Sequence, residues 1–455
     1  MKTSSLAGAR VAVAAAFFAQ GFVFISLTTR LPRFLERWGL DELTLSLLLL
    51  MMVLLAGVGS LVAEHTARRF GSGPTLRLGL ALMVVAVPAI TLAPAISVFV
   101  GGVAVYGIAL GLIDATTNMQ AVDLEHRYGR PILPSSHGYW TTGGISAAVL
   151  VLATGHLSPA VGAVVTLVPL LVAFAPFLPH EAREPGDSST RQAAPSPSVG
   201  DGAREAPVPW RPIWLVGAGL VVFYMVDTTA AAWGPVYLAR AFDAPGNLVA
   251  LATFPYLVTS IVVRLAGGRL VTRFGVVPVL QVGAVLGCGA LALVALAPSW
   301  QSAVVGFTLL GAAVALVAPL SFSAAGRIAA ETARTARTAR TGGGSVAVEN
   351  AVGAENAVGA GGTASVPGAD RAGGAPNGPA SVADRARTDA VIARFNQFNY
   401  VGALLGSVLT GFVGADNLRL GFALPAVLVL ALVPLAPAFA RSTFKRAEAD
   451  PNISE

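Results

Sequence analysis

The sequence predicts an all-α membrane protein in which twelve transmembrane helices form two six-helix halves. The first observation is a series of about twelve apolar runs of roughly 20 residues, the length that crosses a bilayer. The second is composition: the chain is 55% hydrophobic and only 12% charged, with a mean hydropathy of +0.70. The third is an internal sequence repeat. A soluble fold cannot bury this much apolar surface. The number of soluble domains therefore cannot be estimated from the chain length.

The apolar runs divide into two sets of six. In the first half they cover 8–29, 42–63, 76–94, 96–118, 136–155 and 158–178. In the second half they cover 212–233, 246–266, 277–297, 300–322, 390–414 and 418–440. We therefore expect an N-terminal half at 1–179, a linker at 180–211, a C-terminal half at 212–326 and 389–441, an insert at 327–388, and a tail at 442–455.

Two polar breaks interrupt the apolar pattern. The break at 180–211 is rich in Pro, Ser, Arg and Glu, and is typical of a linker between halves. The break at 327–388 contains TARTARTART and the near-repeat AVENAVGAENAVGA. Because this composition offers few large apolar side chains to bury, we expect the insert to be disordered. It is either a tolerated surface insertion or a regulatory segment.

The basic residues indicate the orientation in the membrane. When alternate loops are placed on opposite sides, 25 of the 30 Lys and Arg residues fall on one side. The other side carries Arg30, Arg33, Arg37, Arg240 and Arg419. The positive-inside rule then predicts cytoplasmic termini, linker and insert in a multi-pass protein of the plasma (inner) membrane. The net charge of +6 therefore does not indicate a nucleic-acid partner.

Short sequence features exclude other classes. The single Cys288 lies in an apolar run, so the chain has no disulfide framework. The first run is longer than the apolar core of a cleavable signal peptide. Both lysines are near the ends of the chain, so no ATP-binding P-loop is present. We find no metal-ligand cluster and no nucleophile triad, and expect neither a cofactor nor an enzyme.

A short loop motif occurs twice. The segment ARRFGSGP (Ala67–Pro74) follows the second run, and VTRFGVVP (Val271–Pro278) follows the eighth. Their Arg-Phe-Gly cores are 204 residues apart and occupy the same place in each half. This pattern is typical of parallel-repeat transporters, whose substrate site lies between the halves near the midplane.

Several further segments carry a family resemblance. They are GLIDATTNMQAVDLEHRYGRP (Gly111–Pro131), SSHGYWTTGG (Ser135–Gly144), TRLPRFLERWGL (Thr29–Leu40) and VDTTAAAWGPVYL (Val226–Leu238). With the paired loops, the chain resembles the major facilitator superfamily, and more narrowly its branch of fucose permeases and YbjJ-type permeases. The resemblance implies gate roles for Arg69, Gly71, Arg273 and Gly275. The chain departs from the family's loop motif at Arg68 and Thr272, where an Asp is usual.

Ionisable residues inside a span are costly and usually face a cavity. Asp114 follows Gly107 and Gly111 at four-residue spacing, and Asn118 lies one turn further along the same helix face. Asp227 lies in the middle of the run 212–233, after Tyr224. In the resembling family an acid at the position of Asp114 serves proton coupling or sugar binding. The alternative for both acids is a helix-packing contact.

Other polar residues complete the candidate site. They are Gln20 in the first run, His137 at the start of the fifth, and Asn396 and Asn399 in the eleventh. His137 can titrate near neutral pH, although a membrane-interface position is the alternative. The two Asn side chains can hydrogen-bond hydroxyl groups or cap the helix end. The run 8–29 has no acid, so proton coupling through it is not supported.

These observations predict a monomeric secondary transporter that works by alternating access, binds a small molecule and is embedded in a lipid bilayer. We expect a proton-coupled symporter for a sugar-like or other metabolite substrate. A drug or metabolite efflux transporter of the same fold is the first alternative. A membrane sensor without transport activity, which signals through the insert, is the second.

Overall fold

The computed structural model describes residues 3–128, 133–154, 160–178, 210–328, 395 and 397–440. All regular structure in these ranges is helical. Nine helices in the described ranges are long and apolar enough to cross a membrane. Together with α6, the α7–α8 pair and α16, they correspond in order to the twelve apolar runs of the sequence.

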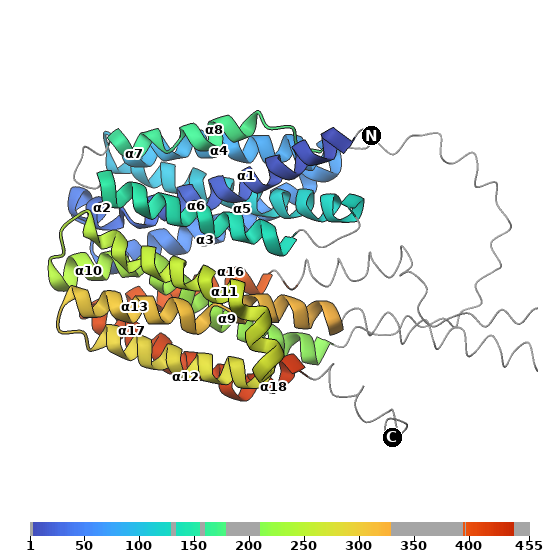
Figure 1. The fold of residues 1–455 in the computed structure, drawn as a ribbon. Coiled ribbons are helices and arrows are strands. Elements are labelled where there is room, and N and C mark those ends of the chain that lie inside the picture. The colour runs from blue at the N-terminus through green and yellow to red at the C-terminus, as the bar shows by residue number, and fades with distance from the viewer. Residues whose placement is uncertain are drawn as a thin grey trace, which may run out of the picture.

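The helices α1–α8 form the first group, which lies in the upper part of Figure 1. Their bounds are α1 (Thr3–Thr28), α2 (Leu31–Trp38), α3 (Glu42–Phe70), α4 (Ser72–Thr91), α5 (Ile96–Tyr128), α6 (Leu133–Thr154), α7 (Ala160–Val164) and α8 (Leu167–Ala173). The sixth crossing is thus a pair of short helices joined by a turn at 165–166.

The helices α9–α18 form the second group, below the first in Figure 1. Their bounds are α9 (Trp210–Thr228), the π-helix η1 (Thr229–Trp233), α10 (Gly234–Phe242), the 3₁₀-helix η2 (Leu248–Ala252), α11 (Phe254–Phe274), α12 (Val276–Ala295), α13 (Trp300–Val314), α16 (Gln397–Val413), α17 (Leu418–Leu428), the 3₁₀-helix η3 (Val429–Ala431) and α18 (Leu432–Ala440). After a turn at 315–316, residues 317–328 continue α13 as helix.

The bundle has two ends, which we name for use below. The N/C end is where α1 begins and α18 ends, and the distal end is the opposite one (Figure 1). The predicted breaks at 180–211 and 327–388 lie outside the described residues except at their edges. There, 210–211 belong to α9 and 327–328 to the helix that follows α13.

The repeat of the sequence extends to the helices that follow it. Gly71 and Gly275, 204 residues apart, separate α3 from α4 and α11 from α12 with φ angles of 95° and 83°. Both angles are allowed for glycine but strained for any residue with a Cβ. The bounds of α4 and α12 share the same offset, as do the first residues of α5 and α13. The two halves therefore reuse one local design.

Two arginines from non-equivalent positions cap equivalent helix ends in the two halves. Arg37 donates to the carbonyl oxygens of Thr91 and Ala93 at the end of α4. Arg419 donates to Ala295 and Ala297 at the end of α12, and these acceptors again lie 204 residues further along the chain. Since a helix C-terminus presents unsatisfied carbonyls and a partial negative charge, a guanidinium stabilises it.

Small residues bring α3 and α5 into direct contact. A Cβ at Gly111 would overlap the carbonyl oxygen of Ala56, and one at Gly107 would lie 2.6 Å from that of Met52. These two glycines thus allow the two helix backbones to approach closely. This approach fixes the face of α5 that carries Asp114, one turn beyond Gly111.

The two groups are joined at the distal end by polar contacts. Arg240 of α10 lies 3.8 Å from a carboxylate oxygen of Glu42 and donates to the carbonyl oxygen of Leu40 at 3.1 Å. We call these three residues the distal latch. Nearby, Asn247 donates to the carbonyl oxygen of Leu152 at 3.4 Å. These contacts hold the two groups together at the distal end in this structure.

Candidate functional site

Asp114 lies where the two groups of helices meet. Its Oδ2 accepts a 2.7 Å hydrogen bond from the hydroxyl of Tyr400, which belongs to α16 of the second group. Its Oδ1 accepts a 3.3 Å bond from Nε2 of Gln20 on α1. The hydroxyl of Ser60 on α3 lies next to the Tyr400 side chain. We call Asp114, Gln20, Tyr400 and Ser60 the Asp114 cluster, which joins α1, α3, α5 and α16.

The side-chain amide of Gln20 uses its nitrogen but not its oxygen in a hydrogen bond. Its side chain is 5% exposed, and its Oε1 atom has no hydrogen-bond partner among the described residues. An unpaired buried acceptor is costly, and native proteins keep few of them. Because Nε2 is engaged by Asp114, the free Oε1 is available to a donor that enters from between the helices.

Asp227 forms a second carboxylate–tyrosine pair, within the second group. Its Oδ1 accepts a 2.5 Å hydrogen bond from the hydroxyl of Tyr256 on α11. The π-helix η1 begins two residues later, and its Thr229 side chain bonds Thr410 of α16 at 2.8 Å. The indole of Trp233 donates to the carbonyl oxygen of Ser407 at 3.0 Å. Single-turn π-helices are frequent at functional sites, and this one holds α9 against α16.

Arg264 of α11 is the third charged group of this region. It donates to Thr141 of α6 at 3.3 Å, which again links the two groups, and to the carbonyl oxygen of Ala315 at 3.1 Å. It also interacts electrostatically with Asp227. The charge count of the sequence assigned Arg264 to a basic loop, whereas α11 continues ten residues beyond it. Its position inside the run 246–266 was the signal that could have identified it.

Tyr224 connects the two acids. It precedes Asp227 by three residues on α9 and interacts electrostatically with Asp227, Asp114 and Arg264. Both carboxylates therefore act electrostatically on the same phenol group. The sequence alone identified neither Tyr256 nor Tyr400 as the partner of a carboxylate.

The remaining sequence candidates take different places. The amide of Asn118 donates to the backbone oxygen of Asp114 at 2.8 Å, so this donor bonds its own helix. Asn399 lies half-buried on α16, one residue before Tyr400. His137 belongs to α6, but its side chain is outside the described part, as is the whole of Asn396.

The residues proposed for the gate lie at the N/C ends of α3 and α11. Arg69 and Arg273 are exposed, and each guanidinium lies over the ring of the next residue, Phe70 at 5.2 Å and Phe274 at 5.3 Å. Gly71 and Gly275 follow as the turn residues. In this structure the two arginines are thus placed symmetrically, each on its own helix.

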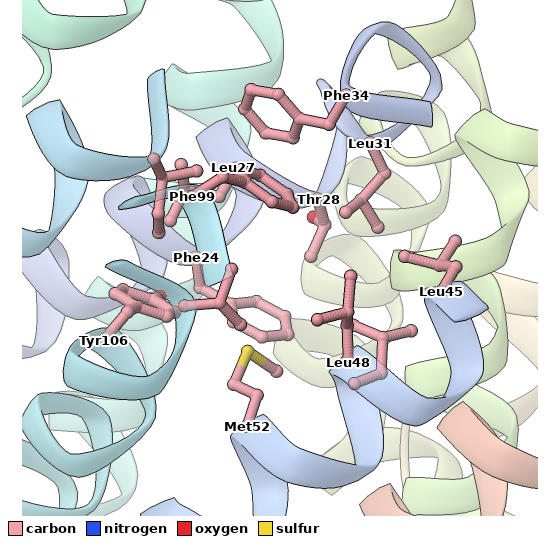
Figure 2. A pocket seen from close by; sticks show the side chains of 13 residues that line it. Phe24, Leu27, Thr28, Leu31, Phe34, Leu45, Leu48, Met52, Phe99 and Tyr106 are labelled. Atoms are coloured by element: carbon pink, nitrogen blue, oxygen red, sulfur yellow. The ribbon is translucent and has the colours of Figure 1, made fainter. Parts of the chain in front are cut away.

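A small pocket of about 50 Å³ lies in the first group towards the distal end, between α1, α2, α3 and α5. Figure 2 shows Phe24, Met52 and Tyr106 around it, and neither Asp114 nor Asp227 lines it. The lining is apolar except for the hydroxyls of Thr28 and Tyr106. Tyr106 is 2% exposed, and its hydroxyl has no hydrogen-bond partner among the described residues.

The chemistry available at the site is proton exchange and hydrogen bonding. Each acid is held by a tyrosine and lies inside a helix of membrane-spanning length. Within the described residues, no three His, Cys, Asp or Glu side chains are grouped to hold a metal ion.

The sequence was compared with known families and curated proteins. The model of the Major Facilitator Superfamily matches residues 2–132. An uncharacterised transporter of Sinorhizobium fredii, y4wD, is 27% identical over 315 residues, which cover 69% of this chain and 81% of that protein. An uncharacterised MFS-type transporter of Yersinia pestis is 25% identical over 326 residues, 70% of this chain and 80% of that protein.

The fold was compared with solved structures. The E. coli fucose:proton symporter FucP superposes with a TM-score of 0.51 at 14% identity, and the alignment covers 94% of this chain and 98% of that one. At this identity the likeness concerns the fold alone. The relatives are named as transporters rather than enzymes. Taken together with the membrane-spanning helices of the described residues and the repeat in the two halves, these matches support a membrane transporter of the major facilitator type.

Proposed function

We propose that the protein moves a small metabolite by alternating access and couples this movement to protons at Asp114. The observation that carries the proposal is the position of this carboxylate, which accepts hydrogen bonds from Gln20 of the first group and Tyr400 of the second. Protonation neutralises the acceptor and weakens both bonds, since hydrogen bonds to a charged group are the stronger ones. Proton uptake is thereby tied to the relative position of the two groups.

Asp227 is the second carboxylate of the proposal. Its tyrosine partner and Arg264 both lie on α11, within the second group. Protonation of Asp227 therefore changes a hydrogen bond inside one group and reaches the other group only through Arg264, whereas protonation of Asp114 changes a hydrogen bond between the groups. For this reason we assign the coupling step to Asp114 and a supporting role to Asp227.

Direction and orientation complete the proposal. The charge distribution of the sequence supports cytoplasmic termini in a plasma (inner) membrane, and the N/C end is then the cytoplasmic one. The structural neighbour FucP is named as a fucose:proton symporter, and the resemblance to the fucose permease branch supports uptake with protons. Efflux of a metabolite by the same cycle is the second candidate, favoured by the apolar pocket.

Proteoliposomes test the coupling. Purified protein is reconstituted with an imposed inward proton gradient and a mixture of sugars, nucleosides and amphipathic amines, and accumulated solutes are read by mass spectrometry. The Asp114→Asn variant is expected to lose gradient-driven accumulation but retain exchange. Asp416→Asn, at an exposed acid between α16 and α17, serves as the matched control. Accumulation by Asp114→Asn with the wild-type dependence on pH would show that Asp114 carries no coupling proton.

A further inference from the structure

The apolar pocket is the distal continuation of the polar site. In an α-helix, residues seven or eleven positions apart lie on nearly the same face, two or three turns along the axis. Leu27 lies seven residues beyond Gln20 on α1, Val103 eleven before Asp114 on α5, and Leu49 eleven before Ser60 on α3. The pocket-lining residue lies on the distal side in all three pairs. The same three helix faces therefore carry the Asp114 cluster and, roughly 10–17 Å further, the pocket.

The Asp114 cluster and the apolar pocket are separated by few residues along α1. Phe24 lines the pocket (Figure 2). It lies about one turn beyond Gln20 on the same helix. On the other side, Met52 lines the pocket where the backbones of α3 and α5 meet at Gly107. Along α1, Phe24 thus lies between Gln20 and the other pocket residues, Leu27 and Thr28.

The polar site favours a ligand group that donates hydrogen bonds. The atoms it presents are the unpaired Oε1 of Gln20 and the carboxylate oxygens of Asp114, all of which are acceptors. A ligand group that donates, such as an amine or a hydroxyl, satisfies the buried Gln20 oxygen. A group that only accepts leaves that oxygen unpaired and adds repulsion from Asp114.

The pocket favours an apolar ligand group of limited size. A pocket of about 50 Å³ has room for roughly four water-sized groups, and water needs two to four polar partners to be stable there. The pocket surface is entirely apolar, because the Tyr106 hydroxyl is buried and the Thr28 hydroxyl donates to its own helix at 3.4 Å. One ring or a short alkyl chain therefore fits this space better than water does.

We propose that the transported solute is amphipathic, with a hydrogen-bond-donating head at Gln20 and Asp114 and a single ring or short alkyl chain in the pocket between α1, α3 and α5. This inference rests on the proposed function and gives its substrate class. A fully hydroxylated sugar would put polar groups against the apolar lining, which costs free energy when they find no partner.

Binding to purified full-length protein in lipid nanodiscs tests the substrate class, with empty nanodiscs as the blank for partition into lipid. The probes are 4-phenylbutylamine and 4-phenylbutanol, which carry ring and donor, butylbenzene, which lacks the donor, and glucose, which lacks the apolar part. We expect both donors to bind at least tenfold more tightly than butylbenzene and glucose. Tighter binding of glucose than of either donor would overturn the proposal.

Variants locate the apolar part of the ligand. Val103→Phe fills the pocket from α5 and is expected to weaken the better-binding donor at least tenfold. Val98→Phe adds the same volume at a position of α5 that is 40% exposed, and should leave the affinity unchanged. If Val103→Phe does not fold, Leu49→Phe fills the same pocket from α3. Unchanged affinity in a folded pocket-filling variant would show that the ring does not occupy the pocket.

The binding assay needs no gradient, so the two proposals fail separately. Donor binding that Val103→Phe weakens, combined with no gradient-driven movement, contradicts the proposed coupling and supports the substrate class. Gradient-driven accumulation of glucose alone, lost in Asp114→Asn, supports the coupling and contradicts the substrate class.

Discussion

Replacing Tyr400 by Phe removes one hydroxyl from the interface between the two groups of helices. This hydroxyl donates to Oδ2 of Asp114 at 2.7 Å, a length typical of a bond to a charged acceptor. Such bonds contribute about 1.5–3 kcal/mol to stability. Since 1.4 kcal/mol corresponds to a factor of ten, a loss of about 2 kcal/mol lowers the population of the present arrangement roughly 30-fold relative to its alternatives.

Distances between spin labels measure this population. The labels are placed at Phe70→Cys and Phe274→Cys, in a Cys288→Ser background. Both positions are more than half exposed. They are the last residues of α3 and α11, which belong to different groups. We expect Tyr400→Phe to move the distance distribution towards a second population. The matched control is Tyr139→Phe, at an exposed tyrosine on α6.

The reasoning has a sharper test in a double-mutant cycle. Asp114→Asn removes the charge that makes the bond strong, so Tyr400→Phe should have little further effect in that background. The coupling between the two changes is then about 1.5–3 kcal/mol. Additive effects of the two substitutions, or an unchanged distance distribution in Tyr400→Phe, would refute the assignment of this bond as a link between the groups.

Three further outcomes follow from the geometry. Gly71→Ala and Gly275→Ala should each cost about 1–3 kcal/mol of unfolding free energy, because both positions have backbone angles strained for alanine; thermal unfolding checks this, and Gly57→Ala, which meets nothing within 4 Å, is the control. Arg240→Ala should lower the free energy of unfolding by no more than about 1 kcal/mol, since the ion pair with Glu42 is partly exposed. It should nevertheless speed amide hydrogen exchange at the distal end, and an exchange rate equal to that of the wild type would speak against a latch. Tyr106→Phe should leave stability unchanged or raise it, because the buried hydroxyl has no partner among the described residues; a loss above about 1 kcal/mol would reveal a partner.

Hydropathy and charge predicted the fold well because the bilayer imposes a length and a composition on every crossing. The order of the crossings and the paired Arg-Phe-Gly loops were readable from the residues alone. The structure added what periodicity cannot give, such as the division of the sixth crossing into α7 and α8 and the π-helix η1. Both depend on how the crossing packs against its neighbours rather than on composition.

The site was predicted in part. Asp114, Asp227 and Gln20 stand out in sequence because polar groups are rare within spans, and the structure places Gln20 on Asp114. The partners Tyr256 and Tyr400 could not be identified, because tyrosine is common in apolar runs and its partner lies up to 286 residues away. Arg264 was missed for a different reason: a charge near the edge of an apolar run resembles a loop charge.

The π-helix η1 stores one surplus residue in the middle of the seventh crossing. Asp227 lies just before it, and Arg240 of the distal latch lies on the helix that continues after it. If η1 relaxed to an ordinary α-helix, everything beyond it would rotate by one residue, about 100° around the helix axis. Arg240 would then turn away from Glu42 while Asp227 kept its place. A transition of η1 from π-helix to α-helix, beside the buried Asp227, would thus rotate α10 at the distal end of the bundle.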